Sequence, residues 1–503
     1  MRLVLILVSA ASLAAVSPAA ELRLNVLDES GAEAWARFEV RGPDGKMHQP
    51  LGALRDITAS NRASGEPWYV GSFVGRGPQV MDLPAGRYLV VVERGPEFER
   101  VEEEITLAGE PIEKTIRPAR WIDMNELGWY SADFHIHRPL EDVPKLIQAE
   151  DLNLGVVFTL WNQRDAFEKS AWPANPVVKV DGRHLYTILN AEDERGGGAW
   201  MLHMLRQKID LKVPGRWYPP GLKFIREAVA QRYVPTGFPW IEVEKPFWLE
   251  APVVMALATP DSIGLLHNHF EQYGMLDNEA WGRARDAKRY PGLQGFVEAS
   301  LEINYRFWNL GFEVPASAGS ASGVLPNPVG YNRLYVEVRE PFDVEPFYRN
   351  LRQGRSFVTN GPMLFFEATE MPGRRVSLEV DVRSREPLDK VEIVANGVVI
   401  ETFAAPPGKT RFETEVSLRE GLYTWVAARA FTRNESTIRM AHSQPLRLQG
   451  FWPTQDDAAF FIRWIDDLIA DSQADSSRFA NEAQRDEVLE IYRQARQFYA
   501  DLQ

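Results

Sequence analysis

Cysteine is absent from this sequence, which excludes disulfide bonds, thiolate metal sites and a cysteine-linked lipid anchor. Any bound metal must therefore be held by histidine and carboxylate side chains. Basic residues are in deficit, since 56 Lys and Arg oppose 70 Asp and Glu and give a net charge of −14. Binding to a nucleic-acid backbone needs a concentrated basic face, so we expect no nucleic-acid partner.

Long apolar runs are also scarce. One occupies residues 3–16, between the positively charged start Met1-Arg2 and the small residues 17–20. This pattern is typical of a secretory signal peptide over residues 1–20, so we expect an exported protein, periplasmic or extracellular. The run is too short to span a bilayer comfortably, and no later stretch is long and apolar enough for a transmembrane helix. We therefore expect no membrane span.

The length of 503 residues and the 45% share of hydrophobic residues are enough for a large core, and the length suggests roughly three domains. Residues 21–117 read as short alternating strands separated by Gly, Pro and Asp turns, which predicts an N-terminal β-sandwich. In residues 118–366, apolar runs of strand length alternate with amphipathic helical stretches. That alternation favours an α/β fold in which side chains at strand ends form the site.

Strands return in residues 367–455, where Asn396-Gly397 between two apolar runs is a strong hairpin signal. We expect a C-terminal β-domain there. Residues 456–503 carry aromatic and aliphatic residues at helical spacing, followed by a charged final helix. This segment predicts a helical tail that docks onto the rest of the protein.

The most informative motif is Ser-Ala-Asp-Phe-His-Ile-His at residues 131–137. Alternate side chains of a strand point to the same face, so His135 and His137 can bind one ion while the residues between them pack behind. The chain has eight histidines, and three more lie in the same middle region: His203, His267 and His269. Glu192 could bridge two ions.

These residues resemble the opening motif of the PHP (polymerase and histidinol phosphatase) superfamily of metal-dependent hydrolases. The segment 354–362, Gly-Arg-Ser-Phe-Val-Thr-Asn-Gly-Pro, following 315–320, resembles the carbaryl-hydrolase-like (CehA/McbA) branch. The segment 439–445, Arg-Met-Ala-His-Ser-Gln-Pro, resembles part of that branch's trailing β-domain. The resemblance covers roughly residues 121–467 and implies a distorted β/α barrel with divalent ions, flanked here by the two β-sandwich-like domains.

Two departures from the family pattern remove metal ligands. The second motif, usually Thr-Asp-His-Asn, stands here as Thr-Leu-Trp-Asn, so Trp161 replaces a ligand histidine. The last motif, usually Gly-Ser-Asp-x-His, stands as Gly-Ser-Ala-Ser-Gly, so Ala321 and Gly323 replace an aspartate and a histidine. None of the three offers a side-chain lone pair. We expect them to cluster beside the site and to leave no third metal position.

The resemblance implies one ion on His135, His137 and Glu192, and a second on Glu192, His203 and His267. We expect one or two divalent ions, each of them Zn, Mn or Fe. His269 is the alternative to His267 or points at substrate. His203 could equally be a satisfied core histidine, and Glu194 is the alternative to Glu192. The remaining histidines are expected to be structural or exposed: His48, His184 and His442.

This constellation favours metal-assisted hydrolysis of an ester, amide or phosphoester in a small-molecule substrate. Asp133 would orient a ligand histidine, while Arg355 and Asn360 would line the pocket. The competing hypothesis is a PHP-like scaffold that has lost its chemistry and binds a carbohydrate or a surface partner. Fold alone does not decide between the two.

Overall fold

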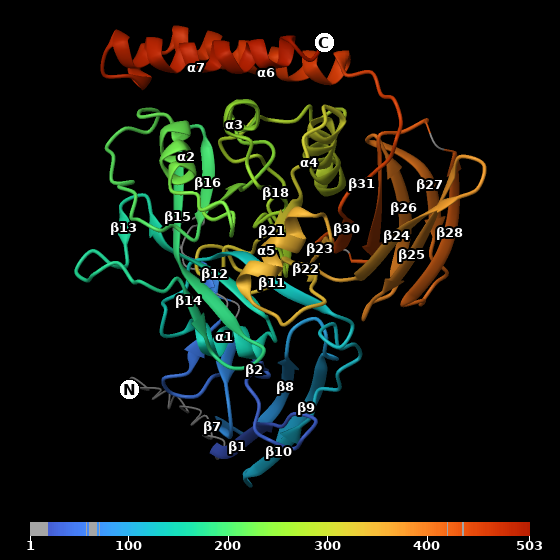
Figure 1. Ribbon diagram of the computed structural model, residues 1–503. Helices are drawn as coiled ribbons and strands as arrows, with labels where there is room; N and C mark the ends of the chain where they lie inside the picture. The colour runs from blue at the N-terminus through green and yellow to red at the C-terminus, as the bar shows by residue number, and fades with distance from the viewer. Residues whose placement is uncertain (1–18, 57, 60–67, 70, 420, 435–436) are drawn as a thin grey trace, which may run out of the picture.

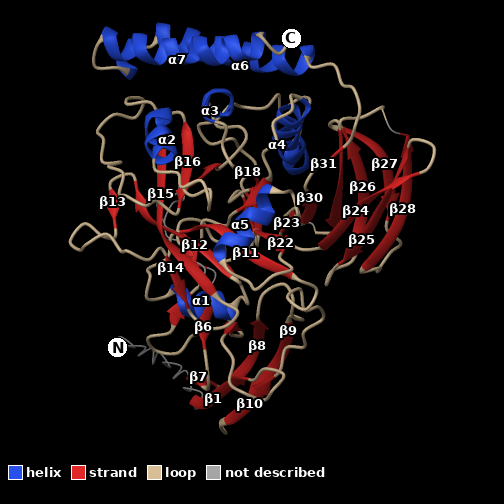
Figure 2. Cartoon of the chain, viewed as in Figure 1, coloured by secondary structure: helices blue, strands red, loops and turns tan. Residues whose placement is uncertain are grey.

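The computed structural model describes residues 19–56, 58–59, 68–69, 71–419, 421–434 and 437–503 (Figure 1). The expected signal peptide lies outside these residues except for Ala19 and Ala20, which begin strand β1 (Ala19–Val26). The chain combines strands and helices in a mixed α/β architecture (Figure 2). Within the described ranges, no helix has both the length and the apolarity needed to cross a membrane.

The N-terminal unit contains two facing sheets and the separate short pair β4-β5. One has the order β10-β1-β7 and the other β3-β6-β2-β8-β9. In β1 every second side chain is buried, as expected for a strand with one face on a core. The other strands are β2 (Ala36–Arg41), β3 (Leu54–Arg55), β4 (Thr58–Ala59), β5 (Trp68–Tyr69), β6 (Phe73–Gly75), β7 (Gln79–Pro84), β8 (Gly86–Glu93), β9 (Val101–Leu107) and β10 (Ile112–Ile116).

The central sheet runs in the order β21-β18-β17-β16-β15-β12-β11. Its strands are β11 (Trp129–Ile136), β12 (Leu154–Trp161), β15 (Leu185–Arg195), β16 (Gly198–His203), β17 (Trp240–Val243), β18 (Ser262–Leu266) and β21 (Ala316–Ala318). β11, β12 and β15 are parallel neighbours and are almost continuously buried, as strands covered on both faces should be. The two ends of this run meet, since a parallel bridge joins Ile136 to Ser322 just after β21.

Helices and short strands surround this sheet. The helices are α1 (Val143–Ala149), α2 (Gly221–Ala230), α3 (Ala251–Ala258), α4 (Gly292–Asn309) and α5 (Val344–Arg352), and the short strands are β13 (Arg164–Asp165), β14 (Val177–Lys179), β19 (Phe270–Glu271) and β20 (Gly274–Met275). Asp343 caps α5 by accepting a hydrogen bond from the Val344 N–H.

The same hydrogen-bonded ladder continues from β11 into the C-terminal β-region through β22-β23-β30-β29-β26-β27. A three-stranded sheet, β24-β25-β28, faces it across a separate apolar core. Asn396 and Gly397 both have positive φ and join β26 to β27 in the predicted hairpin. The strands are β22 (Arg333–Glu337), β23 (Ser356–Thr359), β24 (Met363–Met371), β25 (Arg375–Arg383), β26 (Leu388–Ala395), β27 (Val398–Ala404), β28 (Arg411–Arg419), β29 (Trp425–Thr432), β30 (Met440–Ser443) and β31 (Leu446–Arg447).

The chain ends in a helical hairpin, α6 (Gln455–Ala474) and α7 (Glu482–Ala500), linked through the short 3-10 helix Ser476–Arg478. The hairpin lies across the top of the view over α3 and α4 (Figure 1). The Trp464 indole donates to the Leu249 carbonyl at 3.0 Å, and the Tyr499 hydroxyl donates to the Pro252 carbonyl at 2.9 Å. The aromatic stripe of the tail therefore docks onto the region around α3, as its helical spacing predicts.

Candidate metal centre

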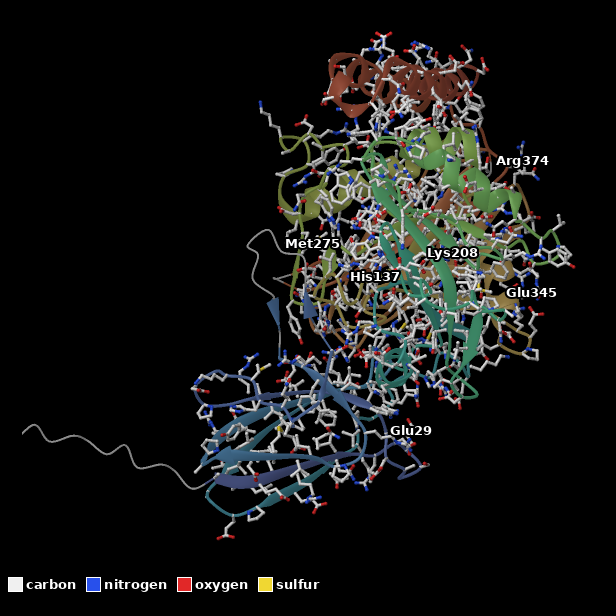
Figure 3. The ribbon with its side chains drawn as sticks, turned by 90° about the vertical axis from the view of Figure 1, so that its left-hand side faces the viewer. Glu29, His137, Lys208, Met275, Glu345 and Arg374 are labelled. Atoms are coloured by element: carbon white, nitrogen blue, oxygen red, sulfur yellow. The ribbon has the colours of Figure 1, made fainter. Side chains whose placement is uncertain are left out.

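The His-x-His pair lies at the end of β11 in the middle of the molecule, where Figure 3 labels His137. Both rings pack against the Phe158 ring of the neighbouring strand β12. The loop after β21 approaches so closely that a Cβ on Gly319 would lie 2.5 Å from the His135 Cβ. Glycine is required there because no larger residue leaves room for the first histidine.

Three ligand atoms converge at this point. The Nε2 atoms of His135 and His137 are 2.9 Å apart, and the Glu192 Oε2 lies 2.9 Å from the His137 Nε2 and 3.6 Å from the His135 Nε2. Glu192 comes from β15, where its pairing with Trp161 of β12 brings it level with the histidines. Within the ranges that the structure describes, this is the one group of three or more His, Asp or Glu side chains whose ligand atoms all lie within 4.8 Å of one another.

The electrostatics of the group favour a cation. Burial lowers the pKa of His135, but the carboxylates of Glu192 and Glu244 outweigh that effect and raise it to about 10. Burial and the charge of His135 lower the pKa of His137. Burial raises the pKa of Glu192, and the two histidines overcome this and bring it to about 2. Glu192 is thus ionised, and its buried Oε2 faces the Nε2 atoms of the two histidines.

Two imidazole nitrogens and an ionised carboxylate suit Zn, Mn or Fe. A buried, ionised carboxylate is costly unless something positive meets it. The residues present therefore fit a divalent ion, and the three of them could hold it.

Glu244 supports the site from behind and was not singled out in the sequence. Its Oε1 lies 3.5 Å from the His135 Nδ1, the ring nitrogen that faces away from Glu192. A carboxylate behind a ligand imidazole fixes the ring orientation and the tautomer that binds the metal. The signal in the sequence is the pair Glu242 and Glu244 at alternate positions of an otherwise apolar segment, which indicates carboxylates aimed at an interior.

Asp133 acts on the backbone and not on an imidazole. Its carboxylate accepts hydrogen bonds from the N–H groups of His135 at 2.9 Å, Ser320 at 3.0 Å and Gly330 at 2.7 Å. Burial raises its pKa against these hydrogen bonds. The expectation that it orients a histidine ring is thus corrected: Asp133 ties the loop after β21 to the start of the His-x-His segment.

Arg355 and Asn360 are not brought to the site. Arg355 is exposed, and its carbonyl accepts from the N–H of Glu337, which pairs with Trp129 at the opposite end of β11 from His135. The Asn360 side chain accepts from the Met440 N–H at 2.7 Å and donates to the Ile438 carbonyl at 3.0 Å. Arg355 lies between α5 and β23, and Asn360 lies in the turn between β23 and β24, so neither side chain joins the ligand group.

His203 does not join Glu192. Its ring lies between Phe134 and Phe158, with Nδ1 2.9 Å from the Tyr348 hydroxyl and Nε2 3.3 Å from the Glu242 Oε2. The ring is enclosed by aromatic side chains, and its Nε2 and the facing Glu242 Oε2 form no hydrogen bond.

His267 and His269 form a second pair, with ring centroids 5.2 Å apart and both packed against Phe247 and Phe296. Burial is the main cause that lowers the pKa of both, to about 3 for His269. Both rings are therefore neutral. The second ligand set implied by the resemblance, Glu192 with His203 and His267, is not assembled.

The three replacement residues gather beside His137. The Trp161 ring centroid lies 4.5 Å from that of His137, and Trp161 packs on a small apolar cluster that contains Ala321. Gly323 has a φ of +97°, and a Cβ on it would lie 2.5 Å from the His137 carbonyl oxygen. These residues fill the volume beside His137 with apolar groups and backbone.

Glu194 lies one pleat beyond Glu192 and faces a cavity of about 340 Å³, lined also by Asn162, Arg216 and Trp281. The Trp161 indole donates to its Oε2 at 2.9 Å, and the Asn162 side chain bonds both its N–H and its carbonyl at 2.8 Å. Burial and the charge of Glu192 raise the pKa of Glu194 to about 7. Glu192 is therefore the glutamate of the ligand group, and Glu194 lines the cavity.

Comparison with models of known protein families finds no match for this chain. No curated protein sequence matches it either. The functional argument therefore depends on the geometry of the site.

Proposed function

We propose that this protein is an exported metal-dependent hydrolase that cleaves an ester, amide or phosphoester at a single PHP-like metal centre. The observation that carries the proposal is the convergence of the ligand atoms of His135, His137 and Glu192 on one point, with Glu192 buried. The meeting of the two ends of the curled sheet beside these ligands also supports a PHP-like barrel.

A bound Zn, Mn or Fe ion would supply a Lewis acid that activates water and polarises the bond to be cleaved. The chain itself contributes three functions. Glu244 holds His135 so that Nε2 faces the ligand group. Glu194, with a pKa of about 7, can take or give a proton near neutral pH. Asp133 keeps the loop after β21 against the histidines.

We infer that a small-molecule substrate binds in the cavity lined by Glu194, which is two residues from Glu192 along β15. Trp281, with 37% of its surface exposed, stacks on the buried Trp248 at 4.9 Å and forms a flat wall. The Arg216 guanidinium lies 5.5 Å above the Trp281 ring centroid. A planar wall with a cation above it favours a ring-bearing or anionic substrate over a polymer.

Purification without chelator, followed by elemental analysis and assays with aryl esters, anilides and p-nitrophenyl phosphate, tests the proposal. We expect bound metal and turnover of at least one substrate class. A folded protein with neither metal nor turnover would contradict it and would favour the scaffold alternative. The observation that favours the scaffold is the apolar filling by Trp161 and Ala321.

A further inference from the structure

The second ligand histidine lies beyond the strand that carries the first. β11 ends at Ile136, so His135 belongs to the sheet, whereas His137 stands in the segment that follows it. The loop after β21 anchors this segment on one side, because the His137 N–H donates to the Ser322 carbonyl at 2.9 Å. A ligand imidazole stays on one point only if the backbone that carries it is also held firmly.

The other anchor is the side chain of Arg138, which reaches into the N-terminal unit. Arg138 is 8% exposed. Its Nη1 donates to the Asp56 carbonyl at 2.5 Å, and its Nη2 donates to the Arg55 carbonyl at 2.6 Å. The planar guanidinium thus engages two successive peptide carbonyls in a fixed fork geometry that an ammonium lacks.

The two carbonyls are themselves held by the sheet of the N-terminal unit. Arg55 pairs with β6, and the Asp56 N–H donates to the Ser72 carbonyl at 3.2 Å. Val74 of β6 also belongs to the same buried apolar cluster as Ile136, the residue between the two histidines. A polar anchor and a shared apolar cluster therefore connect this sheet to the His-x-His segment.

Arg37 fixes the same loop from inside the N-terminal unit. Its Nε lies 3.3 Å from the Asp56 Oδ2 and 2.8 Å from the Glu150 Oε1, and its Nη2 lies 2.7 Å from the Glu93 Oε2. Glu150 follows α1 of the central region, so these ion pairs join the two regions. Because breaking a buried ion pair is costly, the carbonyls that Arg138 contacts lie on a rigid support.

We propose that the N-terminal unit is a structural part of the metal centre and that Arg138 is the positioning residue through which it fixes His137. This inference rests on the proposed metal site and assigns Arg138 no contact with metal or substrate. Without the two hydrogen bonds of Arg138, the segment after β11 would lose one of its anchors, and the His137 ring would sample positions that do not face Glu192. Metal binding should then weaken and the ligand geometry should change while the fold persists.

The metal affinity and ligand geometry of Arg138→Met and Arg138→Lys test the inference. Both variants are loaded with Co(II), whose visible absorption depends on its coordination geometry, and the affinity is measured by competition with a chromogenic chelator. We expect Arg138→Met to bind Co(II) about 10-fold more weakly and with a changed spectrum. Arg138→Lys should lie between this variant and the wild type, because lysine keeps the charge and loses the fork.

Tyr273→Phe is the matched control between the same two regions. It removes the hydrogen bond that the Tyr273 hydroxyl donates to the Glu39 Oε1 at 2.5 Å, which also joins the central region to the N-terminal unit but lies outside the segment 135–138. We expect this variant to keep the wild-type affinity and spectrum, even where thermal unfolding shows a loss of stability.

Wild-type affinity and spectrum in a folded Arg138→Met would overturn the inference and leave the proposed hydrolase intact. An equal loss in Tyr273→Phe would also overturn it, since the effect would then be a general loosening between the regions. Should Arg138→Met not fold, Arg138→Lys decides, and an unchanged affinity and spectrum in that variant contradict the inference. No bound metal in the wild type would instead overturn the proposed function, and this inference with it.

Discussion

Two buried clusters in this protein combine histidine with carboxylates and differ in how the ring nitrogens are used. The His184 Nδ1 lies 2.8 Å from an Asp181 oxygen, and its Nε2 lies 3.3 Å from the Asp151 Oδ1. At the end of β11, the Nε2 atoms of His135 and His137 face each other and the oxygen of Glu192. Each nitrogen of His184 has its own carboxylate, whereas three ligand atoms at the other cluster share one point.

This difference separates a structural histidine from a ligand. Buried polar groups in stable proteins are satisfied pairwise, as at His184 and also at His442, whose nitrogens contact the Ser443 carbonyl and the Tyr305 hydroxyl, each at 2.7 Å. Lone pairs that crowd around one point favour a cation, either a proton, as the raised pKa of His135 indicates, or a metal ion. Counting histidines does not distinguish the two cases. They are distinguished by whether ligand atoms from three side chains share one point.

The largest expected effect comes from removing the ligand pair. His135→Ala/His137→Ala should lose the metal and more than about 100-fold of any hydrolytic activity, since losing even one outer-shell partner typically costs 10–100-fold. Elemental analysis and initial rates measure this, with thermal unfolding to show that the fold persists. His48→Ala, which removes an imidazole in the N-terminal unit, is the matched control. A double variant that keeps full turnover would mean that the cluster is not the catalytic centre.

Removing Glu244 should weaken the centre without dismantling it. Glu244→Gln keeps the side-chain shape but loses the charge behind His135, so metal affinity should fall by about 10–100-fold. Competition with a chromogenic chelator measures the affinity. An unchanged affinity would show that the 3.5 Å contact does not position the ring.

Metal affinity should also depend on pH in a defined direction. The pKa of His135 is about 10 in the metal-free protein, so a proton must leave this ring when a metal binds at neutral pH. Proton and metal compete, and affinity should therefore rise by about tenfold per pH unit below that pKa. Calorimetric titrations in two buffers of different ionisation enthalpy measure the released proton. Binding without proton release would contradict the protonated state of His135.

The smallest effect is expected at His184, and it should appear in stability alone. Burial lowers its pKa, but the hydrogen bonds that its ring donates to Asp151 and Asp181 outweigh this and raise it. A raised folded-state pKa stabilises the fold below the unfolded value of about 6.5, and the contribution is lost as pH rises through the folded value. His184→Gln should therefore cost about 1–3 kcal/mol near pH 6 and less at high pH.

Urea unfolding of wild type and His184→Gln at several pH values checks this result. The metal content of the variant should stay unchanged. A loss of metal on changing His184 would remove the distinction between the two clusters.

The sequence predicts the ligand group better than its surroundings. The i, i+2 rule places His135 and His137 together without knowledge of the fold. Glu192 was identified by motif position, and its strand pairing places it there. Glu244 could not be chosen from many other acidic residues, because its role depends on which strands become neighbours in the curled sheet.

Arg355 and Asn360 illustrate the opposite case. Their motif is recognisable, but its position along the chain does not say where β23 lies relative to the histidines. The two residues flank opposite ends of β23, which pairs with β22 and β30. The mixed α/β class can be predicted from the sequence because the pattern of apolar residues repeats along each strand. The Asn396-Gly397 hairpin can be predicted from the sequence because it depends on local turn geometry. The docking of the tail can be predicted because the apolar residues of α6 lie on one helix face. The continuous sheet that joins the central and C-terminal regions cannot be predicted in this way, since the edge strands of the two regions can pair in many ways.

That continuity has a mechanical consequence. The backbone ladder from β11, which carries the histidines, runs without interruption to β27 at the far edge of the C-terminal region. A load applied at β27 would be shared by hydrogen bonds across each successive strand pair, with no flexible hinge to absorb it. Cutting the chain between residues 366 and 367 would divide β24 and separate β23 from β30. Both fragments would then expose strands with unpaired backbone N–H and C=O groups. We therefore expect the site and the C-terminal region to move as one rigid unit, and they should be studied in the intact protein.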